Sequence, residues 1–250
     1  MSPLFICPAR RSDCVDIARL VLMSTNGIAE YIWRPHVHGR GSLIAVGTQR
    51  CARDEVPFSW TNCLIAEQGG RIAGSLHAVA IPAPLDEDAP VDERDPALRA
   101  LLEFSDRGSL EIRGLAVYPE FRGRGAATRM IAAASAQARA RGLARLSVIC
   151  FATNEPAIRF YRNFGFAEAA RAAAPAHPAF DHAGGEMLRL VRSSRQTAAE
   201  RALSDVPVAP DSLSGDNGAG DPRNGTSPAG AKGRGASRPG ATVVPICAAG

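Results

Sequence analysis

The 250-residue sequence has a single lysine, Lys232, so arginine supplies nearly all of its positive charge. The formal net charge is +4, and the charged residues are dispersed along the chain instead of forming blocks. Aromatic residues make up only 6% of the sequence. A nucleic-acid-binding surface needs clustered basic residues and exposed aromatic side chains. We therefore expect no nucleic-acid partner.

Long apolar runs, paired cysteines and metal-ligand clusters are also absent. No run reaches the roughly eighteen apolar residues of a membrane span, and the first sixteen residues lack the pattern of a secretory signal. None of the six cysteines forms a CxxC pair, which favours free thiols in a reducing compartment over disulfides or a zinc site. His36, His38 and His77 have no second partner at metal-ligand spacing. These absences predict a cytoplasmic protein with no membrane association and no metal.

The composition changes near Ser193. The segment 193–250 is rich in Gly, Pro, Ser and Asp and contains no Phe, Tyr or Trp. Such a segment cannot bury enough apolar surface to offset the entropy of ordering. We expect a disordered tail over 193–250 and one folded domain over 1–192.

Hydrophobic periodicity divides residues 1–192 into strands and helices. Strands are expected at 4–7, in a hairpin over 62–81 that turns at Gly69–Gly70, and at 109–119, 145–152, 166–171 and 186–192. Helices are expected at 13–24 with Asp13 as N-cap, and at 26–34, 95–104, 124–142 and 155–165. A hairpin followed by strand–helix–strand–helix indicates the α/β (α+β) class, a mixed sheet with helices on its faces.

The stretch "LAVYPEFRGRGAATRM" joins one of these strands to a helix. Pro119 ends the strand, and Gly123 and Gly125 allow a tight turn that leaves backbone N–H groups uncovered at the start of the helix. Such amides bind phosphate or pyrophosphate, and Arg122 and Arg124 add positive charge. The spacing fits neither GxGxxG nor GK[ST]. A glycine-rich turn with solvated arginines remains the alternative.

A second motif, "NEPAIRFYRNFGF", follows about thirty residues after "PEFRGRGAA", which fits Arg/Gln-x-x-Gly-x-Gly/Ala. Together they resemble the GNAT N-acetyltransferase superfamily over about Leu110 to Ala167. The resemblance implies a single GNAT-like domain with a mixed, mostly antiparallel sheet of six to seven strands, splayed central strands and acetyl-CoA as co-substrate.

The resemblance also implies which residues contact acetyl-CoA. The pantetheine arm would lie along the strand, and the pyrophosphate on the turn and helix start. The implied contacts are Leu115, Ala116, Val117, Arg122, Gly123, Arg124, Gly125, Ala126, Ala127, Thr128 and Asn154. A bulge near Gly114 would splay the strand and open a slot for the arm. Asn154 also suits an N-cap of the following helix, and both roles are compatible.

Tyr161 occupies the position of the family's general acid. It lies in a stripe with Ala157, Phe160 and Phe164, spaced for one helix face, so an ordinary core role is the alternative.

Glu111 occupies the position where some members carry a general base. Strict alternation would place Glu111, Arg113, Leu115 and Val117 on one face of the strand. An ion pair between Glu111 and Arg113 is the structural alternative, and a water chain could replace the base. Glu67 and Glu30 are weaker candidates.

The expected activity is therefore acetyl-CoA-dependent N-acetyl transfer to a primary amine of a small molecule or protein. The alternative is a non-catalytic acyl-CoA-binding regulatory module. Acceptor selection is expected from 26–39, where Tyr31 and Trp33 could form an apolar wall, and from 82–107, where the acids at 86–88 could attract a cation. A homodimer is left open.

Overall fold

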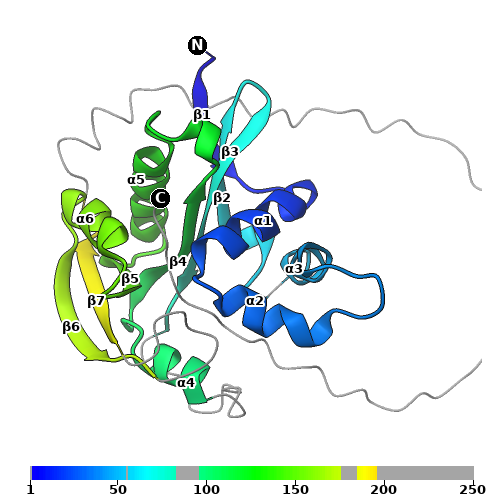
Figure 1. Ribbon diagram of the computed structural model, residues 1–250. Helices are drawn as coiled ribbons and strands as arrows, with labels where there is room; N and C mark the ends of the chain where they lie inside the picture. Colours follow the sequence, from blue (N-terminus) through cyan, green and yellow to red (C-terminus); the bar gives the residue numbers. More distant parts are fainter. Residues whose placement is uncertain (1, 55, 83–95, 176–184, 196–250) are drawn as a thin grey trace, which may run out of the picture.

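The computed structural model describes residues 2–54, 56–82, 96–175 and 185–195, which form one seven-stranded sheet in the order β1-β2-β3-β4-β5-β7-β6 (Figure 1). The strands are β1 (Leu4–Pro8), β2 (Cys63–Gln68), β3 (Arg71–Ala80), β4 (Ser109–Val117), β5 (Arg145–Phe151), β6 (Ala167–Ala173) and β7 (Glu186–Ser193). The β4–β5 pair is parallel and the other pairs are antiparallel. The predicted class, strand number and mixed character are confirmed.

Helices cover both faces of this sheet, with α5 and α6 on one side and α1, α2 and α3 on the other (Figure 1). The helices are α1 (Cys14–Ser24), α2 (Ile28–Trp33), α3 (Leu43–Cys51), α4 (Pro96–Glu103), α5 (Ala126–Ala140) and α6 (Glu155–Asn163). Short 3-10 turns lie at Arg11–Asp13, Arg34–His36, Trp60–Asn62 and Pro119–Phe121. Asp13 takes the N-cap position of α1, but its carboxylate accepts from the backbone N–H of Arg10 at 2.7 Å and not from the helix.

The sequence pattern predicts no element at 43–51, where the structure has α3. Its start has a local cause, because the Ser42 hydroxyl accepts a hydrogen bond from the backbone N–H of Ala45 at 3.1 Å. Gly47 allows α3 to approach α2 closely, since a Cβ there would lie 2.3 Å from the Trp33 ring. The contact depends on a residue fourteen positions away, so local periodicity does not reveal it.

Two apolar clusters hold the helices on the sheet. The alanine-rich α5 buries residues at helical spacing against the sheet, namely Ala126, Met130, Ile131, Ala134 and Ala138. On the opposite face α1 and α2 bury Ile17, Ala18, Ile28 and Trp33 together with Ile149 of β5. Burying one large apolar side chain contributes about 1.5–3 kcal/mol.

A bulge interrupts β4 where it pairs with β3. Gly114 lies opposite His77, and Ile112 lies opposite Ala78, so Arg113 has no partner residue in β3. This confirms the bulge expected near Gly114. On its other edge β4 pairs with β5 only from Ser109 to Ile112. Beyond Ile112 the two central strands are therefore splayed, as expected.

The bulge corrects the predicted side-chain alternation along β4. Leu115 and Val117 belong to the apolar cluster on the α5 side. Arg113 instead lines a cavity on the α1 side, and Glu111 contacts Ser105, which follows α4. The single face expected for all four residues is wrong, because one inserted residue reverses the alternation after Arg113.

Other predictions have mixed outcomes. The five cysteines at positions 7, 14, 51, 63 and 150 are free thiols, as predicted, and Cys247 lies outside the described residues.

Strand β7 runs to Ser193, and the predicted tail beyond residue 195 lies outside the described residues, as do the acids at 86–88. None of the described helices combines the length and apolarity required to cross a membrane. The cytoplasmic location stays a prediction.

Candidate active site at the β4–α5 junction

The turn between β4 and α5 presents a set of free backbone amides. Gly123 and Gly125 have φ values of 72° and 81°, in the region that favours glycine, and no atom lies within 4 Å of a Cβ built on either. Within the described part of the chain, no amide from Gly123 to Thr128 donates a hydrogen bond. Free amides at a helix N-terminus attract anions.

Two exposed arginines border these amides. The Nε atom of Arg122 donates to the carbonyl of Val117 at 3.3 Å. The Nη1 atom of Arg124 donates to Oε1 of Gln68 at 3.1 Å, and its guanidinium lies 5.5 Å from the centre of the Phe121 ring. The contacts hold both cations beside the turn while leaving part of each guanidinium accessible.

The open edge of β4 leads directly to this turn. Leu115, Ala116 and Val117 have buried side chains and pair with β3, but their other backbone edge has no partner in β5. A strand edge without a partner offers N–H and C=O groups to an extended ligand. The residues present therefore fit acetyl-CoA, with the diphosphate at the amides and the amide-containing arm along β4.

Tyr161 lies on α6 within the apolar cluster on the α5 side and is completely buried. Its ring packs edge-on against Phe160 and Phe166, each with centroids 5.2 Å away. The structure thus brings Tyr161 into the same cluster as Leu115 and Val117. Its role as general acid stays a prediction.

Glu111 and Arg113 form the ion pair considered as the structural alternative. Arg113 Nη2 lies 3.1 Å from Glu111 Oε1, and the two side chains are 2% and 0% exposed. Ser105 also donates to Oε1 at 3.1 Å, whereas Oε2 has no hydrogen-bond partner among the described residues. Burial raises the pKa of Glu111, and the charge of Arg113 opposes that rise. A role as base stays a prediction, and Tyr161 approaches from the other face of the sheet.

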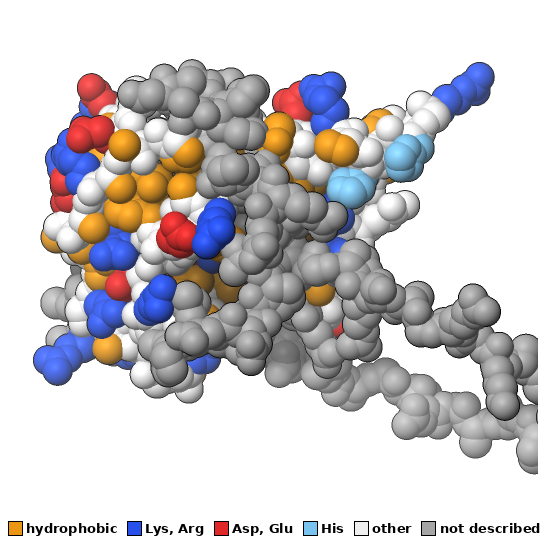
Figure 2. Space-filling model, turned by 90° about the horizontal axis from the view of Figure 1, so that it is seen from below, with side chains coloured by type: hydrophobic (Ala, Val, Ile, Leu, Met, Phe, Trp, Pro, Cys, Tyr) orange, Lys and Arg blue, Asp and Glu red, His pale blue; other side chains and the backbone are white. Residues whose placement is uncertain are grey.

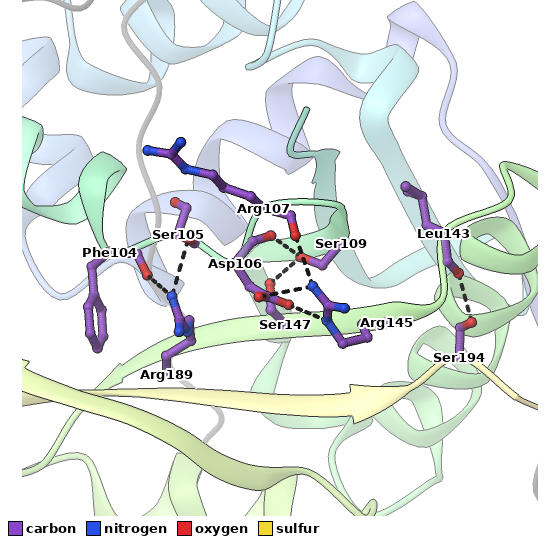
Figure 3. Close-up of polar contacts among 10 residues, drawn as sticks. All are labelled: Phe104, Ser105, Asp106, Arg107, Ser109, Leu143, Arg145, Ser147, Arg189 and Ser194. Carbon is purple, nitrogen blue, oxygen red and sulfur yellow. Dashed lines mark hydrogen bonds and ion pairs between the residues drawn. The ribbon is translucent and has the colours of Figure 1, made fainter. Parts of the chain in front are cut away.

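The segment that carries Ser105 is fixed by a polar network at the end of the sheet (Figure 3). Arg145 of β5 binds the Asp106 carboxylate at 2.9 Å and the carbonyl of Arg107 at 2.9 Å. Arg189 of β7 donates to the carbonyls of Phe104 and Ser105 at 3.2 and 3.3 Å. These four contacts from two strands therefore hold the position from which Ser105 reaches Glu111.

The remaining candidates occupy ordinary positions. Asn154 caps α6, because its Oδ1 accepts from the backbone N–H of Ala157 at 3.2 Å, and its contact to the cofactor stays a prediction. Glu30 pairs with Arg34 on α2, and Glu67 is half-buried on β2. Tyr31 is exposed and Trp33 is buried, so the two do not form one wall.

The three histidines within the described residues occupy two kinds of position. His36 and His38 are exposed on the connection between α2 and α3, which projects from the body of the molecule (Figure 2). His77 is buried, its Nε2 atom lies 2.9 Å from the carbonyl of Pro57, and burial lowers its pKa to about 4. Among the described residues no cluster of metal-ligating side chains occurs.

Sequence reasoning did not identify Arg50 and Phe58, which share a cavity with His77 and Arg113. No local signal marks them, since α3 and the segment after it were not assigned. The pairing register of β3 with β4 also cannot be read from either strand alone.

Solved structures with the same fold are acetyltransferases. An N-acetyltransferase from Staphylococcus aureus Mu50 is 17% identical with a TM-score of 0.51, covering 75% of this chain and all of its own. A structure described as an acetyltransferase is 19% identical with a TM-score of 0.53, covering 76% and 99%. An agmatine N-acetyltransferase variant is 13% identical with a TM-score of 0.50, covering 76% and 99%. No curated protein matches the sequence.

A model of the acetyltransferase (GNAT) family matches residues 28–166, more than half of the chain. The chain belongs to the GNAT acetyltransferase family, and it is an acyltransferase of the type that uses acetyl-CoA.

Proposed function

We propose that this protein transfers the acetyl group of acetyl-CoA to a primary amine of a small molecule or protein. One observation carries the proposal: free amides from Gly123 to Thr128 and an unpaired edge of β4 lie next to each other in the chain. The two features complement the two ends of one ligand, a diphosphate and an arm that contains amides. Family membership supports acetyl-CoA as that ligand.

The proposed binding roles follow from the free groups. The amides from Gly123 to Thr128 would hold the diphosphate, with Arg122 and Arg124 adding charge-assisted contacts. The backbone of Leu115, Ala116 and Val117 would hold the arm. Asn154 would keep α6 in register and border the arm.

Bound acetyl-CoA supplies a thioester that a neutral amine can attack directly. The Tyr161 hydroxyl would donate a proton to the departing thiolate from the α5 side of the sheet. On the opposite side, Oε2 of Glu111, to which no described residue donates a hydrogen bond, or a water chain would accept the proton of the amine. The raised pKa of Glu111 makes its carboxylate a stronger base than an exposed one. Tyr161 and Glu111 lie on opposite faces of the sheet. They could act on the same reacting atoms only if those atoms lie in the gap between β4 and β5.

Two measurements test the proposal. Isothermal titration with acetyl-CoA should detect binding, and a thiol-release assay over a panel of amines should detect acceptor-dependent turnover. Binding without acceptor-dependent release from any amine would favour the non-catalytic acyl-CoA-binding module. Absence of binding would refute both functions.

A further inference from the structure

A small cavity lies between α1, α2, α3 and the bulge of β4. Its volume is about 20 Å³, enough for one or two waters or one carboxylate group. Ile32, Trp33 and Phe58 form apolar walls. The Trp33 and Phe58 rings lie 5.7 Å apart between centroids. A cavity of this size leaves room only for a small group, so most of any larger ligand would lie outside it.

Arg113 enters this cavity with unused donors. Its side chain is 2% exposed, and one of its nitrogen atoms, Nη2, binds Glu111. Its Nε and Nη1 atoms have no hydrogen-bond partner within the described residues. A buried donor without an acceptor is energetically costly, so native proteins seldom leave one unused without a functional reason.

Arg50 of α3 faces the same cavity with a second unused donor, Nε. Within the part of the chain that the structure describes, no acidic side chain forms an ion pair with Arg50. His77 is neutral above about pH 4, because burial lowers its pKa. Counting only the residues that the structure describes, Glu111 balances Arg113 and the cavity retains one positive charge without a counter-charge.

The position of the cavity connects it to the proposed reaction. Arg113 is the inserted residue of the bulge, and β4 separates from β5 directly after Ile112. A group held by Arg113 would thus lie beside the gap through which acceptor and acyl group must meet. This step depends on the proposed function.

We propose that Arg113 and Arg50 bind a carboxylate of the acceptor, so that the acceptor class is amines that also carry a carboxylate, such as amino acids. The planar guanidinium matches a carboxylate in shape and charge. The apolar walls exclude water and strengthen the pairing. The small volume favours a carboxylate over a larger phosphate.

The first test compares acceptors that differ only at the carboxylate. L-leucine, L-leucinamide and 3-methylbutylamine, with matched sets for L-phenylalanine and L-alanine, are assayed for acetyl-CoA-dependent thiol release. We expect kcat/KM to be about 10- to 100-fold higher for the amino acid than for its amide in at least one set. Turnover of amines without any preference for the carboxylate would overturn the inference and leave the proposed function intact.

Two variants test whether Arg50 in the cavity causes the preference for a carboxylate. Arg50→Met should reduce the ratio between acid and amide at least several-fold, with the loss mainly in KM for the acid. Arg53→Met is the control, because it removes the same charge from a residue that does not line the cavity, although it also removes the hydrogen bond from Arg53 Nε to the carbonyl of Arg50. A preference that persists in Arg50→Met would place the carboxylate elsewhere and refute the assignment.

A binding measurement without turnover separates the two proposals. N-acetyl-L-leucine should raise the Tm of the wild type and of Arg53→Met more than N-acetyl-L-leucinamide does, and should lose this advantage in Arg50→Met. Equal shifts from acid and amide would indicate a water site only. An equal, Arg50-dependent shift from inorganic phosphate would indicate a general anion site and refute the carboxylate class. If acetyl-CoA does not bind, the proposed function is refuted. The Tm comparison between N-acetyl-L-leucine and its amide still tests whether the cavity binds a carboxylate.

Discussion

Two buried arginines lie on opposite faces of the sheet and differ in how their donors are used. Arg192 of β7, on the α5 side, is 7% exposed and donates to the carbonyl of Phe164 and the hydroxyl of Ser135, both at 2.9 Å. Arg113 on the α1 side is more deeply buried, and two of its nitrogen atoms have no acceptor in the described ranges of the chain. On the α5 side, Arg192 thus joins β7 to α5 and α6. On the α1 side, Arg113 keeps N–H donors available for a ligand. The difference supports the proposal that the α1 side carries recognition of the acceptor.

Removing each arginine gives the largest expected effect. Arg113→Met should lower the free energy of unfolding by about 3–5 kcal/mol, because Glu111 is left buried without its counter-charge. Arg192→Met should cost about 1–3 kcal/mol, since the carbonyl of Phe164 and the hydroxyl of Ser135 to which it donates are neutral groups. Urea denaturation measures both. The double variant Glu111→Gln/Arg113→Met should recover part of the loss, and a loss no larger for Arg113 than for Arg192 would contradict the comparison.

The two ends of α5 provide the next test. Gly125→Glu should weaken acetyl-CoA binding about 10²-fold or more, because a carboxylate would occupy the free amides and repel the diphosphate. Gly142→Glu at the other end is the control, since Gly142 also has a positive φ, 71°, and open space at its Cβ position. Both variants share the backbone strain, so isothermal titration isolates the anion site. Unchanged affinity in Gly125→Glu would remove that site from the proposal.

A tyrosine hydroxyl on each side allows a matched pair of substitutions. Tyr161→Phe should lower kcat about 10²-fold if the hydroxyl protonates the thiolate. Tyr118→Phe removes the hydroxyl that donates to Asp16 of α1 at 2.7 Å, and should reduce stability by about 1 kcal/mol with kcat unchanged. Steady-state kinetics and thermal unfolding distinguish the two. An undiminished kcat in Tyr161→Phe would assign this tyrosine to the core.

The smallest predicted effect concerns pH and His77. Burial lowers its pKa from 6.5 to about 4, so below pH 6.5 the unfolded chain binds a proton that the folded chain refuses. The contribution of neutral His77 to the free energy of unfolding is therefore complete above about pH 6.5. It should fall by about 2 kcal/mol by pH 5. His77→Gln should lack this loss. Comparing the two urea-unfolding profiles cancels the opposite contribution of Glu111, whose pKa is raised, and parallel profiles would contradict the prediction.

Local chemistry made much of this fold predictable. The hairpin turns at Gly69 and Gly70, whose φ values of 62° and 74° require glycine-like freedom, and the turn at Gly123–Gly125 follows the same rule. The bulge near Gly114 was also predicted. The same prediction kept Glu111, Arg113, Leu115 and Val117 on one face of β4, which the bulge does not allow. The burial of Arg113 was not predictable, because it depends on helices and a strand that are distant in sequence. Family resemblance supplied the roles of Tyr161 and Glu111, which the residues alone would not assign.

The splayed strands also bear on edge-to-edge aggregation. An unsatisfied strand border normally invites another polypeptide to add to the sheet, and proteins must guard against it. Here the unsatisfied stretch of β4 lies in the interior of the sheet, between β3 and β5, and not at its rim. A slender, extended ligand arm needs less room at such an interior edge than a second polypeptide chain with side chains on both faces. The fold can thus keep a docking edge permanently available without the hazard of aggregation at that edge.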